Sequence, residues 1–276
     1  MDFLIRFVEL LDTKMTTPEP FGWFHLMWIA IVVILSVLAV LWARKRPDEK
    51  TVRKTVLIVS LVVLLFEIYK QVNFTFKVSD GAITAKYQWY VFPFQFCSTP
   101  MYAGLLAGLV KRGAVRRALC SYIATYGIFA GLCVMAYPGG VFCATAGINI
   151  QTMVCHSAMI ILGVYLFATD FVRAGLKTIL RALAVFVSMV LVAASLNEIV
   201  YYTNASHGET FNMFFFSRHF PSTLPVYGPV HAALPFPLAL VIYVAGFTAA
   251  AFLVLLLGLL LKTLLHALGA RRRAEQ

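Results

Sequence analysis

Apolar residues fall into long segments along the chain, separated by short polar links. Each segment is close to the roughly 20 residues that an α-helix needs to cross the hydrocarbon core of a bilayer. The pattern therefore predicts an all-α fold, a polytopic membrane helix bundle of about seven transmembrane helices. The segments are 22–43, 55–75, 88–110, 115–136, 151–171, 177–202 and 236–262.

The composition agrees with this class and excludes others. Hydrophobic residues make up 61% of the chain and charged residues 13%, which is typical of membrane proteins and of no soluble class. The formal net charge is +11, but the basic residues lie in short runs between apolar segments, so they indicate membrane topology and not a nucleic-acid-binding face. No polar linker divides the chain, and residues 1–276 are expected to form one transmembrane bundle domain.

The distribution of basic residues predicts the orientation. Most of the 23 Lys and Arg residues lie in the links 44–54, 111–117 and 172–181 and in the tail after Leu261, and the intervening links contain few. Basic links remain in the cytoplasm, so we expect the N-terminus outside and the C-terminus in the cytoplasm. We therefore expect the chain to cross a cell membrane several times, and we expect that membrane to be a bacterial inner or plasma membrane.

Two outward regions have their own patterns. Residues 1–20 mix acidic and basic side chains with a brief apolar turn, which predicts an interfacial amphipathic helix and not a signal peptide. Residues 203–235 form the longest link, with an aromatic core at Phe214, Phe215 and Phe216. This link is either a lid that folds back over the bundle or a belt of aromatic residues at the membrane interface.

The third segment, Trp89–Val110, contains polar residues between two prolines, Pro93 and Pro100. A backbone break in hydrocarbon must be satisfied by neighbouring helices or by a wet cavity, so it is expected to face the bundle interior. Entry from outside places Cys97 about 15 Å deep at helical rise. Cys97 and Gln95 are therefore candidate site residues.

His156 lies in the outer half of the fifth segment, at the depth expected for Cys97. Nucleophilic catalysis needs a thiol and a base within hydrogen-bond reach, with a third group that orients the base. Cys97 and His156 fit the first two roles, and Asn197 or Glu198, at the outward end of the sixth segment, fits the third. A lone membrane histidine is equally often a packing residue, and both readings remain open.

Glu67 and Lys70 are charged residues inside the second segment. Because they lie three residues apart on one helical face, they either pair with each other or line a transport path. The sequence contains no phosphate-binding glycine loop or metal-binding motif, and we expect neither a metal nor another cofactor. The five cysteines suggest no disulfide framework.

Several motifs resemble a known family: FPFQFCSTP at 92–100, His156 on a later segment, Asn197, FNMFFFSRHFPSTLP at 211–225 and YGPV at 227–230. They are similar to YwaF-type bacterial integral membrane proteins, whose animal relative, transmembrane protein 164, is an acyltransferase that moves a fatty acyl chain onto ether phospholipids. The resemblance spans the first to the seventh segment. It implies that Cys97 and His156 are catalytic.

The chain departs from the family pattern at two positions. Bacterial members commonly have Pro-Leu-His-Leu-Cys where this chain has Pro-Phe-Gln-Phe-Cys, so Gln95 replaces a histidine. Asn212-Met213 stands where the family has Asn-Tyr, whereas Asn197 keeps its place. If the family histidine carries a proton, this chain lacks that group; if it only donates a hydrogen bond, Gln95 can substitute.

The resulting hypothesis is a membrane-embedded acyltransferase or lipid hydrolase that acts on phospholipid acyl chains through a Cys97–His156 dyad open to the outer leaflet. Its partners would be a membrane phospholipid or lysophospholipid, and the dyad would act by forming a thioester. Gln95, Asn197 or Asn212 would donate hydrogen bonds to the oxyanion.

Two other classes remain as alternatives. One is a transporter or channel for a small polar or lipidic solute, in which Glu67, Lys70 and Glu198 would matter most. The other is a non-catalytic membrane partner or lipid-binding protein, in which the polar residues only join helices.

Overall fold

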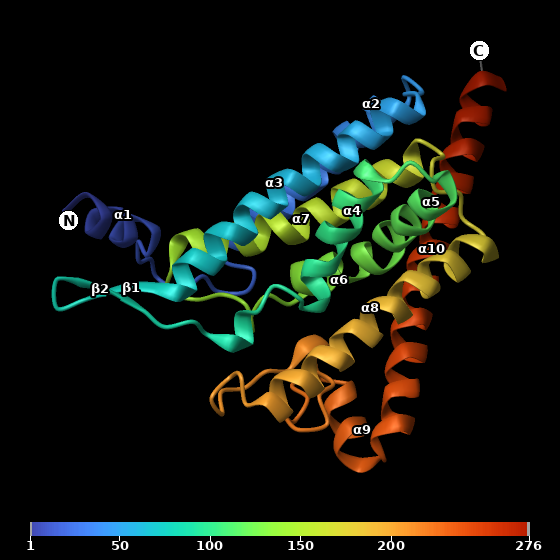
Figure 1. The fold of residues 1–276 in the computed structure, drawn as a ribbon. Helices are drawn as coiled ribbons and strands as arrows, with labels where there is room; N and C mark the ends of the chain where they lie inside the picture. Colours follow the sequence, from blue (N-terminus) through green and yellow to red (C-terminus); the bar gives the residue numbers. More distant parts are fainter. Residues whose placement is uncertain (1, 275–276) are drawn as a thin grey trace.

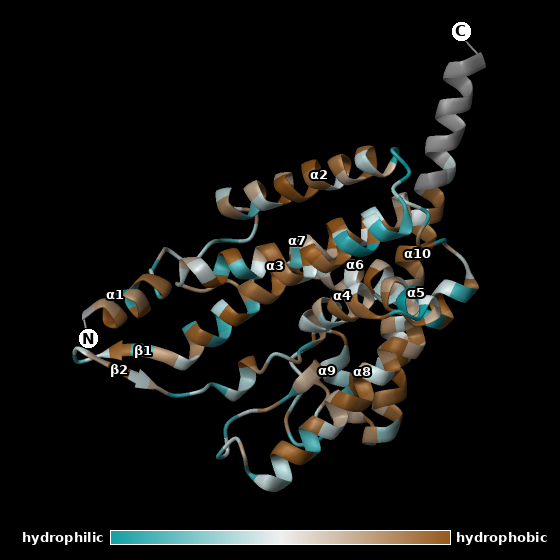
Figure 2. Cartoon of the chain, turned by 45° about the horizontal axis from the view of Figure 1, so that its top comes forward, coloured by the Kyte–Doolittle hydropathy of each residue, from teal (hydrophilic) through white to brown (hydrophobic). Residues whose placement is uncertain are grey.

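The computed structural model describes residues 2–274 and confirms an all-α polytopic membrane protein (Figure 1). Six helices in the described residues are long and apolar enough to cross a membrane. They are α2 (Trp23–Ala43), α3 (Glu49–Thr75), the continuous helix Gly113–Ala136, α7 (Ala146–Ala168), α8 (Leu176–Thr203) and α10 (Phe236–Ala274). Hydrophobic residues cover much of the length of α2, α8 and α10, whose exposed aliphatic side chains are placed to face lipid (Figure 2).

The third predicted segment is helical only in its second half. Its first half contains two 3₁₀ turns, η1 (Trp89–Val91) and η2 (Phe96–Ser98), and α4 covers only Thr99–Leu109. Pro93 disfavours helical backbone at the residue before it, and Pro100 has no N–H and cannot lie in a helix interior, so a regular α-helix begins only next to Pro100. Pro100 fits the first turn of α4, where no N–H partner is needed. The chain therefore enters the bundle as an irregular segment followed by a short helix.

The basic links lie together at one end of the bundle (Figure 1). Arg116, buried at the start of α5 (Gly113–Tyr122), forms an ion pair with Glu49 at the start of α3. Its guanidinium also donates to the carbonyls of Val110 at 2.6 Å and Ala107 at 3.2 Å, at the end of α4. The cytoplasmic links of the predicted orientation are thus tied to one another.

The opposite end carries α1 (Asp2–Leu11) and an antiparallel hairpin of β1 (Phe76–Ser79) and β2 (Ala82–Ala85). Asp12 joins them, because its carboxylate lies 3.0 Å from the ammonium of Lys77. Large apolar side chains of α1 are exposed, an arrangement suited to the predicted interfacial position.

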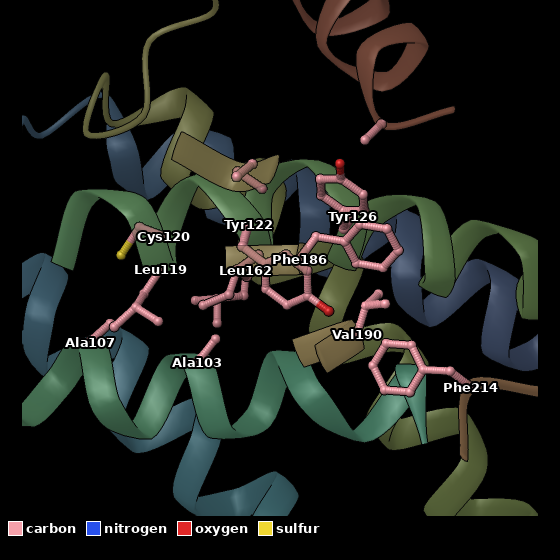
Figure 3. Packing of buried hydrophobic residues seen from close by; sticks show 14 of the residues in the cluster. Ala103, Ala107, Leu119, Cys120, Tyr122, Tyr126, Leu162, Phe186, Val190 and Phe214 are labelled. Atoms are coloured by element: carbon pink, nitrogen blue, oxygen red, sulfur yellow. The ribbon is translucent and has the colours of Figure 1, made fainter. Parts of the chain in front are cut away.

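The centre of the bundle is the helix Gly113–Ala136, which consists of α5, one π-helical turn, η3 (Ile123–Gly127), and α6 (Ile128–Ala136). Every residue of η3 is buried. Tyr122 stacks on Tyr126 with ring centroids 5.4 Å apart, and Tyr126 stacks on Phe186 of α8 at 4.4 Å. Figure 3 shows these rings gathered between the helices, with Phe214 of the outer link beside them. The part of the core between α8 and the central helix therefore consists largely of aromatic rings.

Candidate functional site

The outer link 203–235 is folded into the bundle. It contains η4 (Met213–Phe215) and α9 (Tyr227–Ala233), and Phe214 and Phe216 are fully buried. The ring of Phe214 packs against Phe96 at 5.7 Å and against Phe186 at 6.4 Å. The interfacial-belt hypothesis therefore fails for Phe214 and Phe216. Phe214 and Phe216 instead form part of the bundle core, and the lid reading of the link stays a prediction.

Three amide side chains hold this link in place, and we call them the loop clamp: Gln95, Asn197 and Asn212. Asn197 donates to the carbonyl of Met213 at 3.1 Å and accepts from the N–H of the same residue at 2.7 Å. Gln95 donates to the carbonyl of Asn212 at 3.1 Å and accepts from the N–H of Phe214 at 3.0 Å. These bonds maintain the left-handed backbone of Phe214, whose φ is +60°.

Asn212 completes the loop clamp from within the link. Its side-chain oxygen accepts from the N–H of Ser217 at 2.8 Å, and its side-chain nitrogen donates to the carbonyl of Pro221 at 3.2 Å. Each clamp amide thus uses its oxygen and its nitrogen on backbone groups. The structure assigns a loop-holding role to all three residues that the sequence indicated as oxyanion donors.

Glu198, which the sequence suggested as a residue that orients His156, instead contacts Arg218 and His219 of the outer link. Its carboxylate accepts from the Arg218 guanidinium at 2.7 Å and lies 3.1 Å from the His219 ring nitrogen. The hydrogen bond with Glu198 holds the pKa of Arg218 above its ordinary value. The ring of His219 stacks on Tyr201 with centroids 3.5 Å apart. Glu198 is therefore part of an outer surface cluster.

Cys97 lies in η2, directly before α4, at the N-terminal end of a helical stretch that runs to Leu109. Helix N-termini carry partial positive charge and unpaired N–H groups, which stabilise a thiolate. Cys97 is intermediate in exposure as a residue. Its place at the start of this helical stretch is compatible with a reactive cysteine and with a structural one.

His156 lies on the buried face of α7 and is 5% exposed. Its Nδ1 is 2.7 Å from the carbonyl oxygen of Thr152. A carbonyl oxygen only accepts, so Nδ1 carries the proton of the neutral ring and Nε2 has the lone pair. Gly131 of α6 lies against this turn, because a Cβ there would meet the His156 carbonyl oxygen at 2.7 Å. The Nδ1 contact holds the orientation of the ring on α7.

The structure brings the segments of Cys97 and His156 together. Residues of η2 lie next to α7 and α6, and α3 packs against both α4 and α7. In the described structure no hydrogen bond joins the Cys97 thiol to the His156 ring. Such bonds are often long in the absence of substrate and shorten when it binds.

Glu67 and Lys70 lie three residues apart on one face of α3. The Lys70 ammonium is 2.8 Å from the Glu67 carboxylate, which confirms the predicted pairing. Their helix α3 packs against α4, which follows Cys97, and against α7, which carries His156. We call these four residues the thiol cluster.

Gln71 was not indicated by the sequence analysis, yet it links the thiol cluster to the segment before Cys97. Its amide nitrogen donates to the Glu67 carboxylate and to the carbonyl of Val91, both at 2.8 Å, and its oxygen accepts from the Tyr87 hydroxyl at 3.0 Å. Burial raises the pKa of Tyr87, so the phenol remains a neutral donor. The signal was present, because Gln71 lies one helical turn after Glu67 on the same face.

A small hollow lies between α3, α4, α7 and η3, and its lining residues do not include the four members of the thiol cluster. Its volume is about 20 Å³, and Pro100, Met101 and Cys155 are among its mostly apolar lining residues. One water molecule fits such a space and an acyl chain does not. This hollow is therefore too small to be the open lipid cavity that the sequence predicted. A lipid could bind there only if the lining side chains moved.

Comparison with known proteins provides one match. The model of a family described as the TMEM164 family matches residues 20–260. No curated protein and no solved structure matches the chain. The family is the one that the sequence motifs resemble, and the match covers all six long apolar helices up to residue 260.

Proposed function

The chain belongs to the TMEM164 family, and on that premise we propose that it transfers or hydrolyses phospholipid acyl chains with Cys97 as its nucleophile. The observation that carries the proposal is the position of Cys97. It lies at the N-terminal end of a helix that starts inside the apolar bundle, beside the helix that carries His156. A spanning helix gains no stability from such a break, whereas a thiolate nucleophile gains a favourable electrostatic environment.

The first half-reaction forms a thioester. Nε2 of His156 takes the proton of the Cys97 thiol, and Sγ attacks the carbonyl carbon of a phospholipid ester. The bond from this carbon to the glycerol oxygen then breaks, and His156 returns the proton to the departing lysophospholipid oxygen. The acyl group remains on Sγ.

The second half-reaction restores the thiol. The hydroxyl of an acceptor lysophospholipid, or a water molecule, loses its proton to His156 and attacks the thioester carbonyl. The C–S bond breaks, and the thiolate recovers the proton from His156. A lysophospholipid acceptor makes the protein a transferase, and water makes it a hydrolase.

The N-terminal end of the helical stretch at Cys97 is the expected source of positive potential for the oxyanion, because helix N-termini favour negative charge. The N–H groups of Ser98 and Thr99 already donate to the carbonyls of Gln95 and Phe96, and Pro100 has no N–H. The loop-clamp amides already use their oxygen and nitrogen atoms on the outer link.

The test is acyl transfer by the purified protein in liposomes that contain a phospholipid with a labelled acyl chain. Transfer is measured with a lysophospholipid acceptor, and hydrolysis as labelled fatty acid in its absence. We expect Cys97→Ala to abolish both and the wild type to carry an acyl adduct on Cys97, detected by mass spectrometry. Cys155→Ala is the matched control, because it removes a buried thiol one residue from His156. Full activity of Cys97→Ala would refute the proposal.

A further inference from the structure

A second hollow lies at the end of the bundle where the basic links gather (Figure 1). Its volume is about 310 Å³, and it is lined by Glu49, Lys50 and Arg53 of α3 and by Arg116 of α5. Ligand-binding hollows have volumes of roughly 300–1,000 Å³, so a small polar group can enter this one. The hollow is separate from Cys97, which precedes α4, because Arg116 binds carbonyls at the opposite end of that helix.

Arg116 is a fixed part of the wall of this hollow. Its side chain is 8% exposed, and its guanidinium binds the Glu49 carboxylate and two carbonyls at the C-terminal end of α4. The C-terminal end of a helix carries partial negative charge, so a cation is stabilised there. The ion pair therefore fixes the first turn of α3 against α4 and α5, and it leaves no net charge of its own.

This ion pair leaves the other two cations of the hollow without a carboxylate. Glu49 and Arg53 lie four residues apart, a spacing at which an acidic and a basic side chain commonly pair on a helix. Glu49 is instead held by Arg116. Within the described residues, neither Lys50 nor Arg53 forms an ion pair. The hollow therefore has a positive net charge, with three basic residues against one carboxylate.

The two links beside the hollow are also strongly basic. Link 44–54 contains six basic and two acidic residues, and link 111–117 contains four basic residues and no acidic one. The carboxylate of Asp48, the second acidic residue of link 44–54, accepts the N–H of Thr51 at the start of α3. Both carboxylates of these links are thus engaged, and neither pairs with Lys50 or Arg53.

The positions of Lys50 and Arg53 are unfavourable for α3 itself. The N-terminal end of a helix carries partial positive charge, and cations there oppose the macrodipole. Lys50 lies in the first turn of α3, and Arg53 follows one turn later on the same face. An anion bound between them would offset both cations and the positive end of the helix.

We infer that this hollow binds the phosphate of an anionic phospholipid headgroup in the leaflet at this end of the bundle. Lys50 and Arg53 bind the phosphate oxygens, because ammonium and guanidinium groups form charge-assisted hydrogen bonds with them. Arg116 and Glu49 form the wall against which the headgroup lies. The site is independent of the chemistry proposed for Cys97.

The surface of α3 beyond the hollow favours a lipid over free phosphate as the ligand. Leu61 and Ile68, which are 44% and 50% exposed, follow Lys50 by whole helical turns and so lie on the same face. A phospholipid with its phosphate at Lys50 can place its acyl chains along these side chains. Basic pockets between spanning helices at the cytoplasmic side bind anionic headgroups, and the orientation predicted from the basic links puts this end in the cytoplasm.

The test measures lipid binding and requires no enzymatic activity. The full chain in a neutral detergent is titrated with phosphatidylglycerol, and native mass spectrometry reports the dissociation constant of the first bound lipid. Phosphatidylcholine, which carries a phosphate but no net charge, is the comparison lipid. The variants are Lys50→Gln/Arg53→Gln and Arg53→Lys. The matched control is Lys45→Gln/Lys54→Gln, which removes two exposed charges of the same link outside the hollow.

We expect the wild type to bind phosphatidylglycerol about tenfold more tightly than phosphatidylcholine, because cations near a membrane surface attract anionic headgroups. Lys50→Gln/Arg53→Gln should abolish this preference. Arg53→Lys keeps the charge and should retain most of it. The control Lys45→Gln/Lys54→Gln should retain it as well, since exposed charges outside the hollow are screened by salt.

An equal loss of preference in the control and in Lys50→Gln/Arg53→Gln would overturn the inference, because it would indicate general attraction to a basic surface. A wild type without the preference would overturn it too. Inorganic phosphate is the third arm: if it raised the unfolding midpoint of the lipid-free chain as much as phosphatidylglycerol does, the assignment to a lipid would be wrong. If the hollow variant does not fold, Lys50→Gln is measured alone, and an unchanged preference would refute the site.

Discussion

The thiol cluster and the loop clamp contain polar residues of similar predicted depth, yet their polar atoms bind different kinds of partner. Each amide of the loop clamp binds backbone groups of the outer link through its oxygen and its nitrogen. In the thiol cluster, Lys70 pairs with Glu67, His156 contacts the carbonyl of Thr152 in its own helix, and Cys97 lies at the start of a helical stretch. Backbone partners fix a loop, whereas the thiol cluster is the proposed site of chemistry. The two sets should therefore respond to substitution through different observables.

His156→Ala should separate the two sets most clearly. Loss of a general base typically lowers a rate by 10²- to 10⁴-fold, so we expect a loss of about that size in acyl transfer. The midpoint of thermal unfolding should change much less, since the ring makes one hydrogen bond within its own helix. The liposome assay and a thermal scan on the same preparation check this. Retained activity would assign His156 to packing.

Asn197→Ala should show the opposite pattern. It leaves the buried N–H and carbonyl of Met213 without partners, and each unsatisfied group costs about 1–3 kcal/mol. We expect a loss of about 3 kcal/mol in the free energy of unfolding, measured by denaturation in detergent. Ser195→Ala is the control, because Ser195 is exposed on the same helix. An unchanged stability would contradict the loop-holding role.

Gln95→Leu and Gln95→His test the role of the residue that replaces the family histidine. Leucine removes both bonds to the link, and we expect a loss of about 2 kcal/mol. Histidine has one donor and one acceptor when neutral and should restore part of this loss. The pH profile of activity should be the same in the wild type and in Gln95→His. A new ionisation that controls the rate in Gln95→His would instead indicate proton transfer at this position.

Glu198→Gln should have the smallest effect. The carboxylate pairs with an Arg218 side chain that is 47% exposed, and exposed ion pairs contribute little. We expect the unfolding midpoint to fall slightly at low salt and to match that of the wild type at high salt, where charges are screened. Loss of acyl transfer with unchanged folding would contradict this and would return Glu198 to the candidate site.

The features predicted from sequence are those that depend on local composition. Hydropathy and the positions of basic residues indicate the class, the segments and the gathering of the links at one end. The two prolines indicate a break in the third segment. The hydropathy pattern did not indicate that regular α-helix is confined to the second half of that segment. Burial of Phe214 was undetermined, because its partners come from α8 and η2, far apart in the chain. The roles of Gln95 and Asn197 depend on the same long-range contacts.

The π-helical turn η3 shows how one residue changes the neighbours of a helix. A π-turn accommodates one residue more than an α-helical turn, which rotates all later side chains by about 100°. Before it, α5 packs against α8 and α4; after it, α6 packs against α7. Deletion of a single residue between 123 and 127 would thus turn Gly131 away from the backbone of His156 while leaving the hydropathy of the segment unchanged. In related chains, alignment gaps at this turn would mark a change of helix partner, and a comparison of segment lengths would detect it without any structure.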